Sequence, residues 1–117
     1  DHFKSINDIH GHAAGDRVLT ELGGLLRAHF SGRGLAARYG GEEFVVLMPD
    51  TGMDIARLQC DFLRMAVMDM PLGIPLTVSI GVAVHCHGDN VEATLARADA
   101  ALYRAKAEGR NQVVAAD

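Results

Sequence analysis

A glycine pair between two apolar runs is the feature that most constrains the fold of this chain. The apolar runs are residues 34–37 and 44–48, and Gly40 and Gly41 lie between them. Glycine reaches positive φ without a Cβ clash, so two runs of strand character joined by Gly-Gly predict a β-hairpin. A bare backbone at a turn also lets an anion approach main-chain N–H groups.

Two adjacent carboxylates, Glu42 and Glu43, follow the glycine pair where the turn enters the second strand. They repel each other, and no basic residue follows closely enough to neutralise them. A cation is the simplest group that would satisfy both, and hard carboxylate oxygens suit magnesium. Glycines for phosphate approach, next to carboxylates for a metal, indicate a nucleotide site.

Hydrophobic periodicity and glycine or proline breaks predict the other elements. Helices are expected over residues 3–9, from about 15 to 31, over 54–70 and over 91–108, with strands over 76–84 and 112–115. Long antiparallel strands with helices packed on the sheet favour an α+β fold. The buried stripe expected on the helix over 54–70 is Ile55, Leu58, Phe62 and Met65, and Met68 and Met70 are also expected as core residues. The buried stripe expected on the helix over 91–108 is Val91, Leu95, Ala98 and Leu102.

Size and composition exclude several classes of protein. A chain of 117 residues predicts a single domain with one core. No apolar run approaches the ~20 residues that span a bilayer, and a net charge of −4 argues against a nucleic-acid partner. Cys60 and Cys86 fit no zinc, redox or disulfide pattern, so we expect reduced thiols in a cytoplasmic protein. The chain opens without an initiator Met or an apolar lead-in, as if cut from a longer protein.

The run Gly40-Gly41-Glu42-Glu43-Phe44 resembles the signature of GGDEF domains, the diguanylate cyclases that join two GTP molecules into cyclic di-GMP. Blocks at residues 3–16, 76–83 and 98–111 resemble further family motifs in the same order. The resemblance implies a single GGDEF domain over residues 1–117, with a mainly antiparallel five-stranded central sheet flanked by helices, similar to nucleotidyl cyclases and polymerase palms. The family's first strand, with a second acidic metal ligand, would precede Asp1.

Guanine recognition is implied for Asn7 and Asp16. Guanine presents N1–H and N2–H₂ as adjacent donors that one carboxylate accepts together, and adenine lacks this edge. Without the family, capping of a helix N-terminus is the alternative role of Asp16.

The resemblance places the phosphates near Gly40 and Gly41 and near basic side chains. The matching substrate residues are Phe3, Lys4, Lys106 and Arg110. Without the family resemblance, Lys106 and Arg110 near a helix end would be interpreted as solvated charges that the helix dipole favours. Glu42 and Glu43 are the catalytic carboxylates that would hold Mg²⁺ or Mn²⁺.

The implied activity is diguanylate cyclase activity across a homodimer, under the control of an N-terminal sensory or regulatory domain, without nucleic-acid or membrane contact. The alternative is a non-catalytic GGDEF module that binds GTP or a protein partner; the intact signature favours the enzyme. Product-inhibited members carry Arg and Asp where this chain has Ser31 and Gly34, so feedback is not expected. His85 and His87 are expected in solvent at a strand end.

Overall fold

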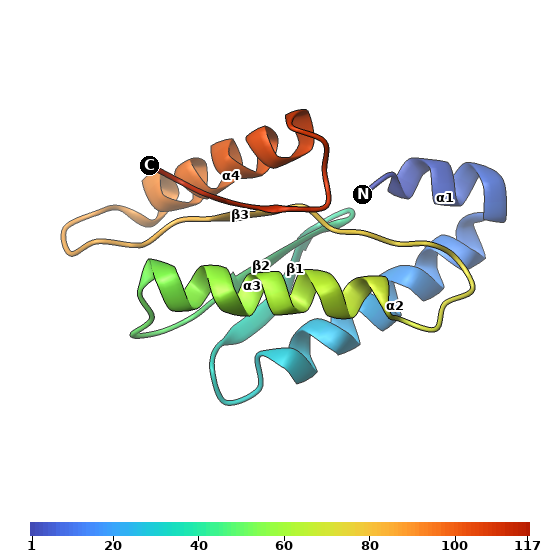
Figure 1. Ribbon diagram of the computed structural model, residues 1–117, viewed down its shortest axis with the longest axis horizontal. Helices are drawn as coiled ribbons and strands as arrows, with labels where there is room; N and C mark the ends of the chain where they lie inside the picture. The colour runs from blue at the N-terminus through green and yellow to red at the C-terminus, as the bar shows by residue number, and fades with distance from the viewer. The chain divides into compact units, whose positions relative to one another are not determined.

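The computed structural model describes residues 1–117 as two compact units, and each is described here by itself. The N-terminal unit, His2–Asp50, contains α1 (Phe3–His10), α2 (His12–His29), β1 (Leu35–Gly40) and β2 (Glu43–Leu47) (Figure 1). The C-terminal unit, Thr51–Asp117 together with Asp1, contains α3 (Met53–Met68), β3 (Ile80–Val82), α4 (Val91–Ala107) and β4 (Val113–Ala115). None of these helices combines the length and apolar character that a membrane span requires.

The N-terminal unit is built on α2, which packs against both α1 and β1. Residues at helical spacing on α2 bury one apolar face, which is closed by Phe30 with 1% of its surface exposed. The buried residues of this face are Val18, Leu19, Leu22 and Leu26. Gly23 lies on the same helix within van der Waals reach of the Phe44 ring, since a Cβ there would lie 3.6 Å from it. The absence of a side chain at Gly23 therefore lets the hairpin approach α2.

The predicted hairpin is confirmed. β1 and β2 pair antiparallel, with Leu35 opposite Leu47 and Arg38 opposite Phe44, and the register shifts between Arg38 and Gly40. Gly41 has a φ of 30°, which is the positive φ that favours glycine at a tight turn.

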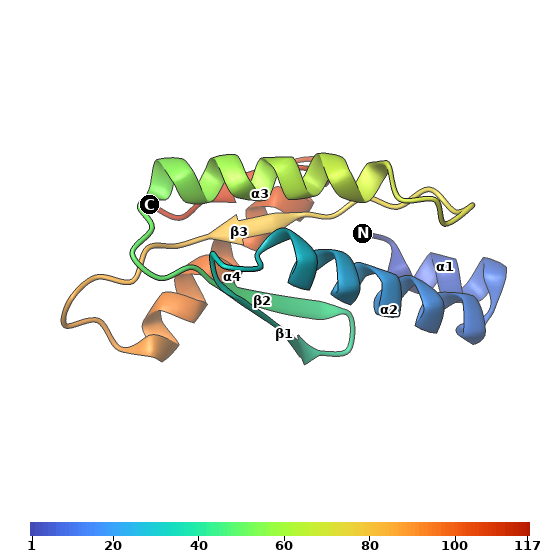
Figure 2. The ribbon, with the colours of Figure 1, turned by 90° about the horizontal axis from the view of Figure 1, so that it is seen from below.

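The C-terminal unit places its sheet between two helices. β3 and β4 pair parallel, and both views show β3 between α3 and α4 (Figures 1 and 2). Gly81 in β3 lies directly against α4, because a Cβ there would be 2.1 Å from the Ala98 carbonyl oxygen and 2.4 Å from the Leu102 nitrogen. Ala101 and Ala105, with no exposed surface, form the face of α4 that meets the sheet. Small residues thus allow strand and helix to pack closely.

The expected five-stranded, mainly antiparallel sheet is not confirmed, because the structure has two two-stranded sheets. One of them is parallel because α4 forms the connection from β3 to β4, and a helical crossover returns the chain in the same direction. The strand predicted over residues 76–84 pairs with a neighbouring strand only at Ile80–Val82. The strand that the family resemblance placed ahead of Asp1 lies outside the sequence.

The expected buried face of α3 is also wrong, and the expected face of α4 is confirmed only in part. On α3 the stripe Ile55, Leu58, Phe62 and Met65 is exposed, as is Met68, whereas the stripe Ala56, Cys60, Leu63 and Val67 is buried. Both stripes have helical spacing, so periodicity alone does not decide which one faces the sheet. The buried stripe contains the smaller side chains. On α4 only Val91 of the expected stripe is exposed, at 64%, whereas Leu95, Ala98 and Leu102 are partly buried. The fully buried residues of α4 are Ala101 and Ala105.

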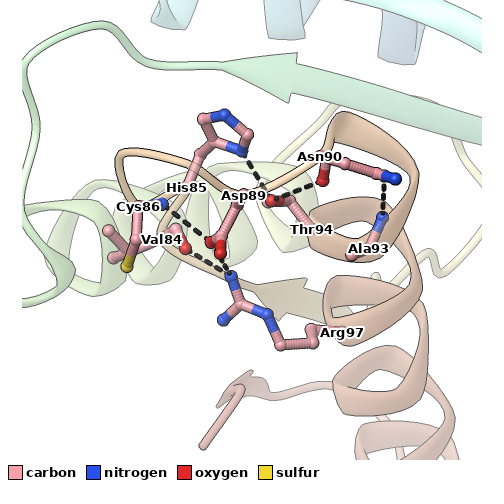
Figure 3. Close-up of polar contacts among 8 residues, drawn as sticks. All are labelled: Val84, His85, Cys86, Asp89, Asn90, Ala93, Thr94 and Arg97. Atoms are coloured by element: carbon pink, nitrogen blue, oxygen red, sulfur yellow. Dashed lines mark hydrogen bonds and ion pairs between the residues drawn. The ribbon is translucent and has the colours of Figure 1, made fainter.

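The loop between β3 and α4 is closed by polar contacts (Figure 3). Arg97 Nη2 donates to the Val84 carbonyl oxygen at 2.6 Å and pairs with Asp89 Oδ2 at 3.2 Å. Asp89 also accepts the Cys86 N–H, and the Asn90 side chain caps α4 by accepting the Ala93 N–H. Beyond β3, His85 and His87 are exposed, as predicted, and His85 Nδ1 lies 2.6 Å from Thr94 Oγ1.

Candidate nucleotide site

The elbow between α1 and α2 contains a buried oxygen without a partner. Asn7 Oδ1 is buried and makes no hydrogen bond. Gly15 provides the space beside it, because a Cβ at that position would lie 1.8 Å from Asn7 Oδ1 and 3.1 Å from the Phe3 ring. An unsatisfied buried acceptor costs about 1–3 kcal/mol. A ligand that donates a hydrogen bond at this elbow would remove that cost.

Asp16 does not cap its helix. The prediction that α2 begins near Gly15 is wrong, since α2 begins at His12 with Gly11 as its N-cap residue. Asp16 lies beyond the first turn and is exposed, so the free N–H groups at the start of α2 are not its partners. It follows Gly15, which contacts Asn7, and this places both predicted guanine residues at one elbow.

The hairpin turn leaves its two carboxylates without a neutralising charge. Glu42 and Glu43 are both exposed, and neither is a partner in an ion pair. The nearby guanidinium of Arg38 instead donates to the Gly41 carbonyl oxygen, through Nε at 2.8 Å and also through Nη2. This role of Arg38 was not predicted from the sequence, although the spacing of three residues between Arg38 and Gly41 is compatible with such a contact.

Two adjacent carboxylates fit the oxygen donors that Mg²⁺ prefers. The structure brings no group of three or more His, Cys, Asp or Glu side chains together for a metal ion. The chain itself therefore offers two acidic ligands at the turn, and the further ligand expected from the family resemblance would precede Asp1.

The remaining predicted residues lie in both units. Lys4 is exposed on α1 and Phe3 is partly buried next to Gly15, both in the N-terminal unit. Lys106 is half-buried in the last turn of α4, and Arg110 is exposed just beyond that helix, both in the C-terminal unit.

A separate cavity of about 560 Å³ lies in the C-terminal unit between α3 and the segment 111–113. Its charged lining residues are Asp54, Arg57, Asp61 and Arg64. Arg64 pairs with Asp61 at 2.8 Å, so positive and negative groups balance there. No residue predicted for the nucleotide lines this cavity.

Comparison with known proteins decides the family. The model of the GGDEF domain of diguanylate cyclases matches residues 1–112. The chain belongs to the GGDEF family. This GGDEF domain is 45% identical to the diguanylate cyclase DgcM of Escherichia coli K12 over 118 residues, which cover 99% of the chain and 29% of DgcM.

Solved structures agree with this assignment. The coiled coil and GGDEF domain of DgcB from Caulobacter crescentus, in complex with c-di-GMP, superposes with a TM-score of 0.93 at 34% identity, covering 99% of this chain and 65% of that one. The active GGEEF domain of a diguanylate cyclase from Vibrio cholerae superposes with a TM-score of 0.91 at 31% identity, and the match covers 100% of this chain and 78% of that one. The α+β fold of this chain is therefore the GGDEF fold.

Proposed function

We propose that this GGDEF domain is a diguanylate cyclase that condenses two GTP molecules into cyclic di-GMP and two pyrophosphates. The observation that carries the proposal is the hairpin turn at Gly40–Glu43, where an open glycine backbone adjoins two exposed carboxylates that no side chain neutralises. Such a turn suits a triphosphate with its metal ion.

Guanine would bind at the elbow between α1 and α2. The Asn7 amide oxygen, buried without a partner, is an acceptor for a donor on the base. The Asp16 carboxylate would accept the N1–H and N2–H₂ groups of guanine together. Because adenine lacks these paired donors, the elbow would select GTP over ATP.

Glu42 and Glu43 would hold Mg²⁺ or Mn²⁺, and the bound metal would lower the pKa of the attacking 3′-hydroxyl and orient the phosphates. Lys4, Lys106 and Arg110 would neutralise phosphate charge, with backbone N–H groups near Gly40 and Gly41 as further donors.

In each of two equivalent steps the 3′-oxygen of one GTP bonds to the α-phosphorus of the other. The bond from that phosphorus to the pyrophosphate oxygen breaks, and the hydroxyl proton passes to solvent. The residues of the domain would accelerate both steps chiefly by placing the two reactants in line.

One domain would hold one GTP, so two copies would face each other across a two-fold axis. The chain spans 29% of DgcM, and we propose that it likewise works inside a longer protein under an N-terminal sensory or regulatory domain. The activity would then depend on how that segment brings two copies together.

The test uses the full-length protein with GTP and Mg²⁺, and cyclic di-GMP is measured by mass. Glu42→Gln should lower the turnover by at least about 100-fold, since it removes a metal-bound charge at the transition state. The melting temperature should stay unchanged because Glu42 is exposed and unpaired. Glu21→Gln, an exposed carboxylate on α2, is the matched control and should retain activity. Retained activity in Glu42→Gln would contradict the proposal.

The second candidate is a module that binds GTP without turning it over. It would need only the guanine elbow, where the Asn7 oxygen is buried without a partner. A folded wild-type dimer that binds GTP but yields no cyclic di-GMP would support this module over the cyclase.

A further inference from the structure

The loop that carries Arg110 has an unusual backbone. Gly109, Arg110 and Asn111 have φ values of 119°, 64° and 47° in succession. Glycine adopts such values freely and asparagine tolerates them, but for arginine the left-handed region costs roughly 1–2 kcal/mol. A run of this kind persists only where neighbouring groups hold it.

Asn111 is held from several directions. Its main-chain N–H donates to Asp1 Oδ2 at 3.1 Å, and its side-chain Oδ1 accepts from Arg64 Nη1 at 3.1 Å. Its Nδ2 lies 3.5 Å from Met68 Sδ. Arg64 and Met68 belong to α3, so both the helix and Asp1 fix the end of the loop.

The Asp1 carboxylate is the centre of this arrangement. Thr77 Oγ1 donates to Oδ2 at 2.8 Å, and Ser79 Oγ donates to Oδ1 at 2.7 Å. The Asp1 main-chain nitrogen also donates to the Thr77 carbonyl oxygen at 2.9 Å. Hydrogen bonds to an ionised carboxylate are about twice as strong as neutral ones. One carboxylate therefore ties the extended segment before β3 to the loop after α4.

We propose that Asp1 is a positioning residue for phosphate binding, which acts by fixing the Gly109–Asn111 loop and thereby the direction in which Arg110 points. The inference rests on the proposed function, in which Arg110 binds the triphosphate. Arg110 is exposed and is in no ion pair, so its direction depends on its backbone. The end of α4 holds this backbone on one side, through the Ala105 carbonyl oxygen that accepts the Arg110 N–H, and Asp1 holds it on the other side at Asn111. A guanidinium binds phosphate best through two parallel hydrogen bonds, which demand a defined approach.

A purely structural role for Asp1 predicts a different result. Loss of structural contacts would lower the stability of the protein and would weaken all guanine ligands alike. Loss of positioning would weaken only the ligands that carry phosphates, and only while Arg110 is present.

The experiment measures binding of two probes to the full-length protein. One is 3′-deoxy-GTP, which lacks the attacking hydroxyl, and the other is 3′-deoxyguanosine, which lacks the phosphates. Asp1→Ala should weaken 3′-deoxy-GTP by about tenfold, the equivalent of one charge-assisted hydrogen bond, and should leave 3′-deoxyguanosine within about twofold. In an Arg110→Ala background, adding Asp1→Ala should cause no further loss.

Asp89→Ala is the matched control. Asp89 also accepts a main-chain N–H and binds an arginine, but it does so in the loop between β3 and α4 (Figure 3). The Asp89→Ala substitution should leave the affinity for both probes unchanged. Should Asp1→Ala fail to fold, Asp1→Asn keeps one acceptor oxygen and should give a smaller loss, again for 3′-deoxy-GTP alone.

The failures of the two proposals are distinguishable. A wild-type protein that binds neither probe overturns the proposed function and this inference with it. A wild-type protein that binds both, with equal losses for both probes in Asp1→Ala or Asp1→Asn, overturns the positioning role alone. The positioning role is also overturned if the losses of affinity for 3′-deoxy-GTP caused by Asp1→Ala and Arg110→Ala add in full in the double variant.

Discussion

The hairpin turn at Gly40–Glu43 and the loop at Gly109–Asn111 both present residues that we assign to the phosphates and their metal, yet they are held differently. The hairpin turn is exposed, and its anchor is Arg38 of the same hairpin, which donates to the Gly41 carbonyl oxygen. The loop is held by the end of its own helix, where the Arg110 N–H donates to the Ala105 carbonyl oxygen, and in addition by α3 and Asp1, which are remote in sequence.

We infer that the loop is a preformed part of the proposed site and that the hairpin turn is a part that a ligand would complete. The Asp1 and Arg64 contacts fix the loop before any nucleotide binds. At the hairpin turn two adjacent carboxylates repel each other, so a cation would bring them to one geometry. We therefore expect the metal to order the hairpin turn and to leave the loop unchanged.

The largest expected effect on stability comes from the close contact between β3 and α4. Gly81→Ala would push a Cβ into the backbone of α4, at 2.1 Å from the Ala98 carbonyl oxygen. We expect a loss of about 3 kcal/mol or failure to fold, since neither backbone can yield cheaply. Gly40→Ala is the control at the hairpin turn, where no atom lies within 4 Å of the added Cβ. Urea denaturation compares the two variants, and equal losses would show that α4 is not locked against β3.

The next effect is on nucleotide choice. Asp16→Ala should weaken GTP by about 10- to 100-fold, the equivalent of one or two charge-assisted hydrogen bonds, and should leave ATP nearly unchanged. Asp8→Ala removes an exposed carboxylate from α1 and is the matched control. Calorimetric titration gives both affinities. If Asp16→Ala weakens GTP and ATP equally, Asp16 does not read the base.

Local sequence signals predicted the parts of this molecule that depend on few residues. Gly40 and Gly41 between apolar runs were enough for the hairpin, because a turn is set by the φ preferences of its own residues. Tertiary choices were missed. The exposed and buried stripes of α3 have the same period, so Phe62 and Leu63 were indistinguishable without the sheet.

In the candidate site, too, residues that are close in sequence were predicted and contacts between distant residues were not. Asn7 and Asp16 were named from a motif of closely spaced residues, and the structure places both at one elbow. The contact between Asp1 and Asn111 joins residues at opposite ends of the chain. No periodicity or spacing rule reaches across that separation.

A smaller effect on stability is expected from substitutions of Asn111, which test the left-handed backbone of the Gly109–Asn111 loop. Asn111 has a φ of 47°, so Asn111→Ala should destabilise the protein more than Asn111→Gly, by about 1 kcal/mol. Both variants lose the same side-chain contacts to Arg64 and Met68, so the difference between them isolates the backbone conformation. Chemical denaturation of the two variants measures it. Equal stability would mean that the loop relaxes out of the left-handed region.

The smallest expected effect appears only at high pH and concerns Cys60 on the buried face of α3, the helix that also carries Arg64. Burial raises the pKa of the Cys60 thiol to about 11 from the usual 9.0. Below pH 9 the Cys60 thiol keeps its proton in both the folded and the unfolded chain, so this thiol contributes no change in stability there. Between about pH 9 and 11 the unfolded chain loses the proton first, and stability should fall by roughly 1 kcal/mol per pH unit.

Cys60→Ala removes this pH dependence, so the difference in unfolding free energy between wild type and variant should narrow as the pH rises from 9 to 11. Thiol alkylation at pH 8 gives an independent reading of the same burial. Cys86 is exposed and should react at once, whereas Cys60 should react only as fast as the C-terminal unit opens. Rapid modification of both thiols would mean that α3 does not stay packed on the sheet. The loop would then lose its anchor on Arg64, and its contrast with the hairpin turn would disappear.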